Sequence, residues 1–351
     1  MPVPPALTGL PGTRAVNVLG ALLDLAWCTR PPVVHGFSLA DLWAWLRYMP
    51  ALSGDRELRL RAEWNEIDSH QKTLLSDDFG VAFGVHVLRN HLKIPILADT
   101  RWLLRYLIGR YALRVPRRRR GPRKAPDFFF FTSRGESGVL ECKGSQTSLR
   151  GLRSAMAAGI AQKRNVVATA HRTIVYSLVS GIFVPGESVG TLRPVLIFID
   201  PEDSALGRAI AQIPLNEQRR AVRLVAAAQA FSLAGLHVTA SLLLRETREV
   251  SLEDFNSSVT RDLASLVPRA KQAGEPTYEI LNIVVRPTRG TPFRFRMDAQ
   301  VRVEGSRFLT WLGNESENVD ERLPVTESET TAELELPFGL SIRLSAVEGE
   351  L

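Results

Sequence analysis

The chain of 351 residues contains only two cysteines and no run of eighteen uncharged apolar residues. Two thiols, Cys28 and Cys142, are too few for a disulfide framework, so a reducing compartment is expected. Without a long apolar run, no membrane-spanning helix is expected. The first twenty residues lack the basic and then apolar pattern of a secretory signal. Together these absences predict a cytoplasmic globular protein.

Two common classes of functional site are also missing from the sequence. No G-x-x-x-x-G-K-[ST] motif is present, so the sequence does not support a nucleotide triphosphatase. The chain has six histidines, of which His86 and His91 are five residues apart, a spacing that does not place them on one helical face. With two isolated cysteines, this pattern does not predict a structural zinc site.

Charge is distributed unevenly along the chain. The formal net charge is +7, but residues 301–351 contain eleven acidic and four basic residues, a net charge of −7. The first 300 residues therefore carry a net charge of +14, which favours a polyanionic partner. The acidic C-terminal region could shield the basic cleft, or dock a partner protein or a second copy of the chain; solvated strand faces are the ordinary interpretation.

The pattern of apolar residues predicts three regions: a helical region at 1–69, a core at 70–245 and a β-rich acidic region at 246–351. Strands interleaved with helices in the core indicate an α/β or α+β fold with a mixed sheet. Ser76 is the expected N-cap of one helix, and Asp99 with Thr100 is expected to open another. The expected helices of the first two regions are 13–27, 38–49, 77–92, 101–113, 148–170 and 215–235, and the expected strands of the core are 127–132, 139–143, 173–184, 193–200 and 237–244.

A proline- and glycine-containing basic segment at 114–126 separates the helical part from the first expected strand. Such a composition cannot form a helix interior or a central strand, so we expect an exposed loop. Its basic side chains could neutralise nucleic-acid phosphates and so provide affinity without sequence choice. The alternative is a solvated segment without a ligand. The residues expected to contact nucleic acid are Arg117, Arg118, Arg119, Arg120, Arg123 and Lys124.

The segment "APDFFFFTSRGESGVLECKGS" predicts an antiparallel hairpin with charged residues on one face. Because strand side chains alternate, Glu141 and Lys143 share a face. A register that places Asp127 across from Lys143 adds a second carboxylate to that face. Two neighbouring carboxylates repel one another unless a positive charge lies between them. Oxygen ligands of this kind suit Mg²⁺ or Mn²⁺, and the lysine could orient an attacking water.

These residues carry a family resemblance. Pro126 and Asp127, followed by "ECK" at 141–143 and then a helix, resemble the PD-(D/E)XK nuclease superfamily. The resemblance extends over roughly residues 70 to 200 and implies a restriction-endonuclease-like αβββαβ core. It also implies a Mg²⁺-dependent deoxyribonuclease, with internal cleavage preferred over attack at ends, and a possible place in bacterial defence or mobile-element processing.

The resemblance further implies roles for individual residues. Asp127 and Glu141 would bind the metal with the carbonyl of Cys142, and Lys143 would position the water. Members of the family often carry a polar residue on the following helix, which corresponds to Gln162 or Lys163. Many also have a metal-binding acid on the preceding helix. The candidates for that acid are Glu66, Asp77 and Asp78, of which Asp78 is preferred.

Two other functions remain open from the sequence. The same fold could bind nucleic acid without cleaving it. The segment "GESVG" at 186–190 matches the nucleophile elbow of serine hydrolases, with Ser188 as nucleophile. That elbow requires a strand before it and a helix after it, whereas here Pro185 precedes the motif and a strand-like segment follows. His237 is the only histidine downstream, so a glycine-rich turn is the preferred interpretation.

Overall fold

The fold is taken from a computed structural model. The structure describes part of the chain, namely residues 7–32, 48–49, 51–53, 56–111, 125–163, 174–200, 213–245, 250–266, 270–271, 277–285, 293–301, 308, 310–312, 331–336 and 340–348. Within these residues no helix is both long enough and apolar enough to cross a membrane.

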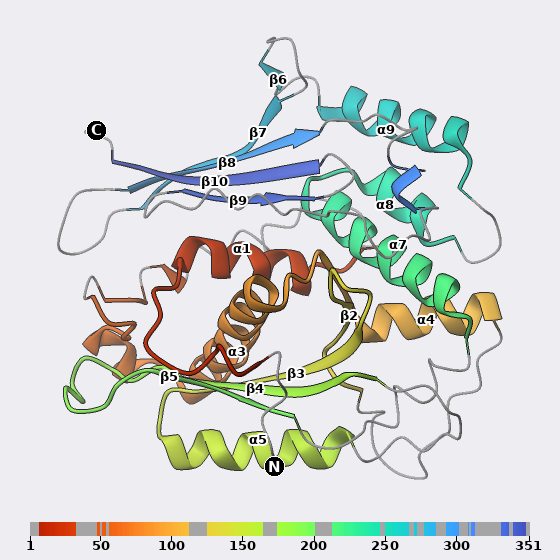
Figure 1. Ribbon diagram of the computed structural model, residues 1–351. Helices are drawn as coiled ribbons and strands as arrows, with labels where there is room; N and C mark the ends of the chain where they lie inside the picture. The colour runs from red at the N-terminus through yellow and green to blue at the C-terminus, as the bar shows by residue number, and fades with distance from the viewer. Residues whose placement is uncertain are drawn as a thin grey trace.

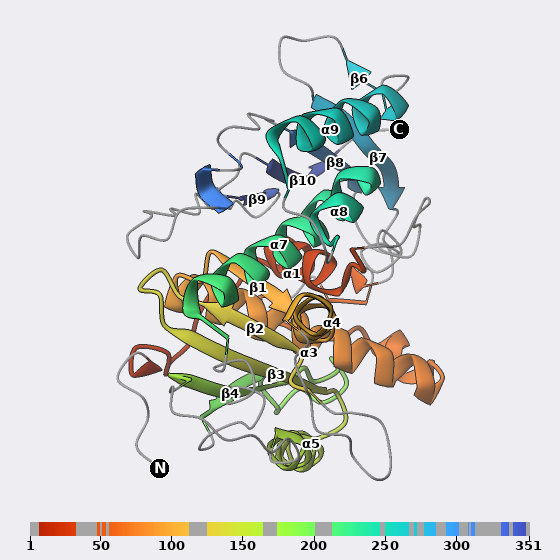
Figure 2. The same ribbon diagram turned by 90° about the vertical axis from the view of Figure 1, so that its right-hand side faces the viewer.

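A five-stranded mixed sheet forms the centre of the expected core region, as Figures 1 and 2 show. Its strands lie side by side in sequence order, and all neighbouring pairs are antiparallel except β3 and β4, which are parallel. A parallel pair needs a crossover connection, and helix α5 provides it. This confirms the predicted mixed α/β architecture. The strands are β1 (Ile96–Asp99), β2 (Phe128–Phe131), β3 (Ser137–Ser145), β4 (Tyr176–Phe183) and β5 (Val195–Ile199).

Helices cover both faces of this sheet. Helix α5 (Leu149–Lys163) lies on one face, where its Leu152 and Met156 pack against Val179 and Phe183 of β4. Helix α3 (Ser69–Leu92) lies on the opposite face and contacts β3 and β4. Figure 1 shows the sheet between these two helices. Burial of apolar side chains on each face fixes the sheet between two layers of helix.

Helix α3 approaches the sheet closely because glycine occupies the contact points. A Cβ atom at Gly80 would lie 2.7 Å from the carbonyl carbon of Lys143, and one at Gly144 would overlap the backbone of Ser76. A Cβ atom at Gly84 would likewise collide with Ser180 of β4. Only glycine allows such backbone contact. The helix is therefore held directly against the end of β3 that carries Lys143.

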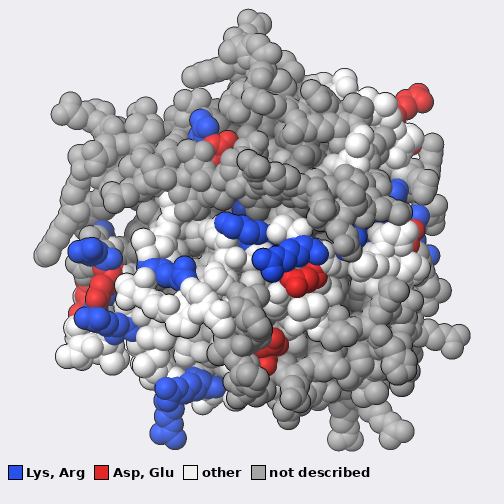
Figure 3. Space-filling view, in the orientation of Figure 1, with Lys and Arg blue, Asp and Glu red and all other residues white. Residues whose placement is uncertain are grey.

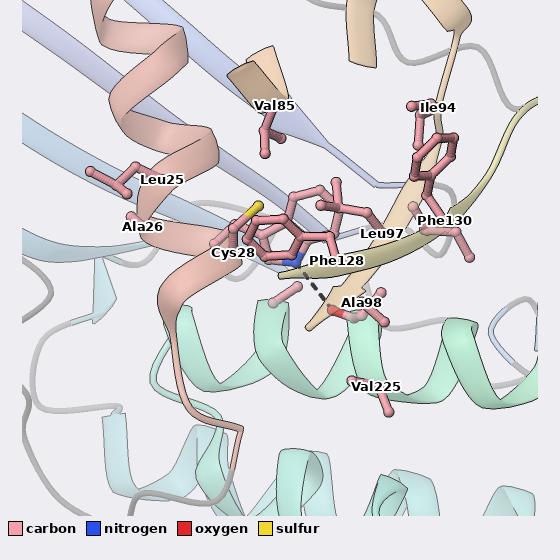
Figure 4. Packing of buried hydrophobic residues seen from close by; sticks show 14 of the residues in the cluster. Leu25, Ala26, Cys28, Val85, Ile94, Leu97, Ala98, Phe128, Phe130 and Val225 are labelled. Atoms are coloured by element: carbon pink, nitrogen blue, oxygen red, sulfur yellow. Dashed lines mark hydrogen bonds between the residues drawn. The ribbon is translucent and has the colours of Figure 1, made fainter. Parts of the chain in front are cut away.

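The remaining helices pack around this centre. Helix α1 (Val18–Thr29) contacts α3, and the Nε1 atom of Trp27 donates a hydrogen bond of 3.1 Å to the carbonyl of Ala226 in α7 (Leu215–Leu233). Figure 4 shows how side chains from α1, α3, β1, β2 and α7 meet in one apolar cluster. The other described helices are η2 (Ala62–Glu66), α4 (Thr100–Tyr111), α8 (His237–Leu243) and α9 (Leu252–Leu266).

A second sheet follows in the C-terminal region and is antiparallel throughout. Its strand β9 contacts α1, so α1 lies between the second sheet and α3, as Figure 1 shows. One apolar cluster includes residues from Leu7 to Leu340 and thus draws on all three predicted regions. The strands lie in the order β6 (Ala270–Lys271), β7 (Thr277–Val285), β8 (Phe293–Val301), β10 (Leu340–Glu348) and β9 (Thr331–Glu335).

Several predicted elements need correction. Helix α3 begins at Ser69 and is capped by Asp68, which accepts a hydrogen bond from the backbone N–H of His70, so Ser76 lies inside the helix. The segment predicted as a strand at 237–244 is helix α8. There the carboxylate of Asp262, from α9, accepts hydrogen bonds from the backbone N–H groups of Val238 and Thr239. This distant residue caps the helix, which a local pattern cannot reveal. Strand β1 was not predicted.

Candidate active site

The β2–β3 hairpin brings Asp127 and Glu141 together. Phe128 is paired with Leu140, so continuing the ladder by one residue places Asp127 opposite Glu141. This differs from the predicted pairing with Lys143 by two residues, which preserves the face on which every side chain lies. Asp127 therefore shares a face with Glu141 and Lys143, as the sequence predicted. The carbonyl of Asp127 also accepts a 2.9 Å hydrogen bond from the N–H of Thr100, which joins the strand to the start of α4.

Hydrogen bonds orient the three charged side chains. The Nζ atom of Lys143 lies 2.6 Å from Oε1 of Glu141, and Oδ2 of Asp127 accepts a 2.8 Å hydrogen bond from the backbone N–H of Cys142. Glu141 is 2% exposed, whereas the side chain of Lys143 is 21% exposed. The ammonium group thus reaches toward solvent from a carboxylate that is itself buried.

The electrostatics of this cluster are unbalanced. Desolvation and the neighbouring charge of Glu141 raise the pKa of Asp127 to about 7, against the opposing effects of the Cys142 N–H and of Lys143. Desolvation lowers the pKa of Lys143, but the carboxylates of Glu141 and Asp127 outweigh it, so this pKa is raised overall. Among the described residues, the two carboxylates thus share the ammonium group of Lys143, and a further cation would relieve their repulsion.

Helix α5 closes over this cluster at a glycine. A Cβ atom on Gly159 would lie 3.3 Å from Cγ of Glu141 and 3.4 Å from Cε of Lys143. The sequence does not single out Gly159, since a glycine within a helix gives no sign of what it contacts. Gln162 and Lys163 follow Gly159 by three and four residues, the spacing of one helical face. Their side chains lie outside the described part of the structure, so their roles stay predictions.

On the preceding helix, Asp77 is the acid that lies within electrostatic reach of Lys143, and the preferred metal ligand Asp78 stays a prediction. Asp78 accepts a hydrogen bond from the hydroxyl of Tyr48 through its Oδ2 atom. Partial desolvation raises the pKa of Asp77, and Lys143 lowers it, which places the ammonium group within electrostatic reach of Asp77. Successive residues of a helix differ by about 100° in direction, so the side chains of Asp77 and Asp78 point to different surroundings. Glu66 lies exposed on η2.

Asp99, predicted from the sequence only as the start of a helix, is a further carboxylate near the cluster. It is paired with Phe128, and its charge contributes to the raised pKa of Asp127. Its Oδ1 atom caps α4 by accepting hydrogen bonds from the N–H groups of Arg101 (2.8 Å) and Trp102 (3.0 Å), which confirms the predicted start of that helix. Desolvation raises the pKa of Asp99, and these N–H groups oppose that rise.

The donors available to a metal ion are oxygen atoms. The thiol of Cys142 points to the opposite face, because its Sγ atom lies beside Gly84 of α3, and burial raises its pKa well above the usual value. Only the carbonyl of Cys142 could therefore join Asp127 and Glu141. Within the described ranges no group of three histidine, cysteine, aspartate or glutamate side chains could hold a metal. Mg²⁺ commonly binds through one or two carboxylates and retains waters, so the pair fits it chemically.

The other predicted contacts with nucleic acid or protein lie largely beyond the described residues. This holds for the basic residues from Arg117 to Lys124, and much of the acidic region 301–351 is likewise not described. On the face shown in Figure 3, basic and acidic side chains are interspersed over the described surface.

Ser188 lies in a turn before β5 and has no hydrolase geometry around it in the described structure. Its hydroxyl accepts a 3.0 Å hydrogen bond from the amide of Asn65, a group that cannot act as a general base. Strand β5 follows the turn where the nucleophile elbow requires a helix.

Comparison with known proteins gives no relative: no family model, no curated protein and no solved structure matches the chain. The chemistry of the site is therefore inferred from its own residues and geometry.

Proposed function

We propose that this protein is a metal-dependent nuclease that hydrolyses phosphodiester bonds in DNA. The observation that carries the proposal is the shared face of Asp127, Glu141 and Lys143, where two carboxylates are opposed by one ammonium group. Asp127, Glu141 and the carbonyl of Cys142 would hold Mg²⁺ or Mn²⁺, which supplies a Lewis acid and lowers the pKa of bound water. Lys143 would orient that water and offset negative charge on the phosphate.

The order of elements supports this proposal. Helix α3, strands β1, β2 and β3, helix α5 and strand β4 follow one another in the αβββαβ order of restriction-endonuclease-like cores, with α4 as an addition between β1 and β2. Parallel pairing of β3 and β4 across α5 agrees with that arrangement. The basic segment before β2 favours a polyanionic substrate, and the family resemblance favours DNA and internal cleavage. A role in bacterial defence or mobile-element processing would suit such an enzyme.

Cleavage of supercoiled plasmid and of single-stranded DNA in Mg²⁺ or Mn²⁺ tests the proposal. We expect nicking and linearisation by the unaltered protein, and a loss of at least about a hundredfold in the Lys143→Ala and Glu141→Gln variants. Arg134→Ala is the matched control, because Arg134 is an exposed basic residue at the other end of the same hairpin. This variant should retain its activity.

The alternative is a protein that binds DNA on the same fold without turnover. It predicts DNA binding by the unaltered protein with no cleavage in any divalent metal. Cleavage that persists equally in Lys143→Ala and Glu141→Gln would show a contaminant or another site, and would also reject the proposal.

A further inference from the structure

The segment that connects β1 to β2, which includes helix α4, begins and ends at the candidate site. The N–H of Thr100, its first residue, donates a 2.9 Å hydrogen bond to the carbonyl of Asp127, although the two are 27 residues apart in the chain. Asp99 caps the same end of the helix. The whole connection between β1 and β2, residues 100–126, is therefore anchored at both ends beside the proposed metal-binding carboxylates.

This connection carries charge of one sign only. From Thr100 to Lys124 the sequence contains ten basic residues and no acidic one. Three of the ten, Arg101, Arg105 and Arg110, lie on α4. A single-sign segment attached to a catalytic strand suits a polyanion better than solvent alone.

Two arginines, Arg101 and Arg105, lie one helical turn apart on the exposed side of α4. Arg101 and Arg105 are exposed, whereas Leu103 and Leu107 on the other side of the helix are fully buried. Within the described residues neither exposed arginine forms a salt bridge, and Arg101 lies within electrostatic reach of Asp99, the residue that caps the helix. Their spacing of four residues corresponds to about 6 Å along the helix axis. One DNA strand rises about 3.4 Å per phosphate, so the pair spans roughly two nucleotides.

Trp102 holds one of these arginines in place. The guanidinium carbon of Arg105 lies 5.2 Å from the centre of the Trp102 ring, within the range of a cation–π interaction. The contact preorganises the guanidinium group on the surface. It also covers one face of the indole ring, which leaves that face unable to stack on an unpaired base. The arrangement therefore favours contact with a phosphate backbone over contact with splayed bases.

We infer that the exposed face of α4, formed by Arg101 and Arg105 with Trp102 beneath, binds the phosphate backbone of duplex DNA next to the candidate site. The choice of DNA as the polyanion rests on the proposed function. The surface adds helix α4 to the contacts that the sequence predicts for the basic segment. A nuclease gains from such an element because phosphates held at a fixed distance position the scissile bond.

The test is the salt dependence of binding, measured without cleavage. A fluorescein-labelled 20-base-pair duplex is titrated in EDTA, and its anisotropy is followed between roughly 50 and 200 mM KCl. In the Arg101→Gln/Arg105→Gln variant we expect weaker binding and a slope of log K against log [KCl] that is smaller by about 2. The matched control is Arg245→Gln/Arg261→Gln, which removes the same charge from exposed positions after α8 and on α9. It should leave the slope unchanged.

Each other outcome overturns the inference. Equal losses in both double variants would show a general charge effect, and an unchanged slope would place the DNA elsewhere. A larger loss on a 20-nucleotide single strand than on the duplex would reject the duplex backbone as the ligand. The experiment distinguishes failure of this inference from failure of the proposed function. A smaller salt slope in Arg101→Gln/Arg105→Gln, with no cleavage by the unaltered protein, would support the DNA-binding surface and reject the nuclease. Cleavage by the unaltered protein, with an unchanged salt slope in the variant, would support the nuclease and reject the surface.

Discussion

The protein contains two clusters of charged side chains, one between α1 and α3 and one beneath α5, and they differ in how their charge is balanced. In the first, Asp24 of α1 lies between two residues of α3: its Oδ1 atom accepts a hydrogen bond from Arg89, and its Oδ2 atom lies 2.8 Å from Nδ1 of His86. The guanidinium of Arg89 also lies over the ring of Trp27, 5.6 Å from its centre. In the second, Asp127 and Glu141 share the single ammonium group of Lys143.

The difference separates a structural cluster from a candidate site. Asp24 is 3% exposed and meets a fixed positive charge and a second donor, so its burial is compensated within the protein. Asp127 is compensated only in part, by the Cys142 N–H and by Lys143, and desolvation with the charge of Glu141 raises its pKa to about 7. A buried carboxylate that the fold leaves partly uncompensated is available to a cation from solution.

Of the changes considered, removal of the Asp24 carboxylate should have the largest effect on the free energy of unfolding. Asp24→Ala leaves Arg89 buried without its carboxylate, and we expect the free energy of unfolding to fall by about 3 to 5 kcal/mol. Urea denaturation at pH 7 measures this loss. The control is Glu57→Gln at a more exposed pair, in which the Glu57 side chain is 43% exposed and lies 2.7 Å from Arg59. There the loss should stay below about 1 kcal/mol. Similar losses in the two variants would contradict the comparison.

Removal of the Asp127 carboxylate, which is only partly compensated, should instead stabilise the metal-free protein. Because the pKa of Asp127 is raised to about 7 from an ordinary value near 4, the folded state holds more protons than the unfolded state between these limits. The free energy of unfolding therefore falls as the pH rises from about 4 to 7. Asp127→Asn removes this dependence and should be more stable than the unaltered protein at pH 8, by on the order of 4 kcal/mol.

Urea denaturation in EDTA at pH 5 and pH 8 measures that difference. Stability curves that run parallel for the two proteins would show that Asp127 is not perturbed. Added Mg²⁺ should stabilise the unaltered protein at pH 8 and leave Asp127→Asn nearly unchanged, because a metal that binds only the folded state adds stability.

A smaller change in stability is expected at Gly159, with a clear change in activity. Alanine there would press on Glu141 and Lys143 from 3.3 and 3.4 Å, while it gains about 1 kcal/mol in helix propensity. We expect stability within about 1 kcal/mol of the unaltered protein and plasmid cleavage reduced about tenfold, since small displacements at a reacting centre are costly. Gly151→Ala is the control on the same helix, because its new Cβ would meet only hydroxyl groups of neighbouring side chains. Equal activity in both variants would show that α5 does not position the pair.

The hairpin illustrates how far the sequence can lead. Strand alternation alone predicts that Asp127, Glu141 and Lys143 share a face, because a shift of the pairing by two residues changes no side chain's direction. The register itself was predicted two residues away from where it lies. Local patterns could not choose it, since the ladder depends on how the four phenylalanines of β2 are buried between neighbouring elements.

The sequence by itself determined the mixed architecture, the start of α4 and the common face of the three charged residues, because these follow from periodicity and local hydrogen bonds. Only the tertiary structure decided that Asp77 lies within electrostatic reach of Lys143, that the charge of Asp99 raises the pKa of Asp127, and that 237–243 is helical. The reason is the same in each case. These outcomes depend on close approach between segments distant in the chain, through glycine contacts at α3 and through capping of α8 by Asp262, and no local pattern contains that information.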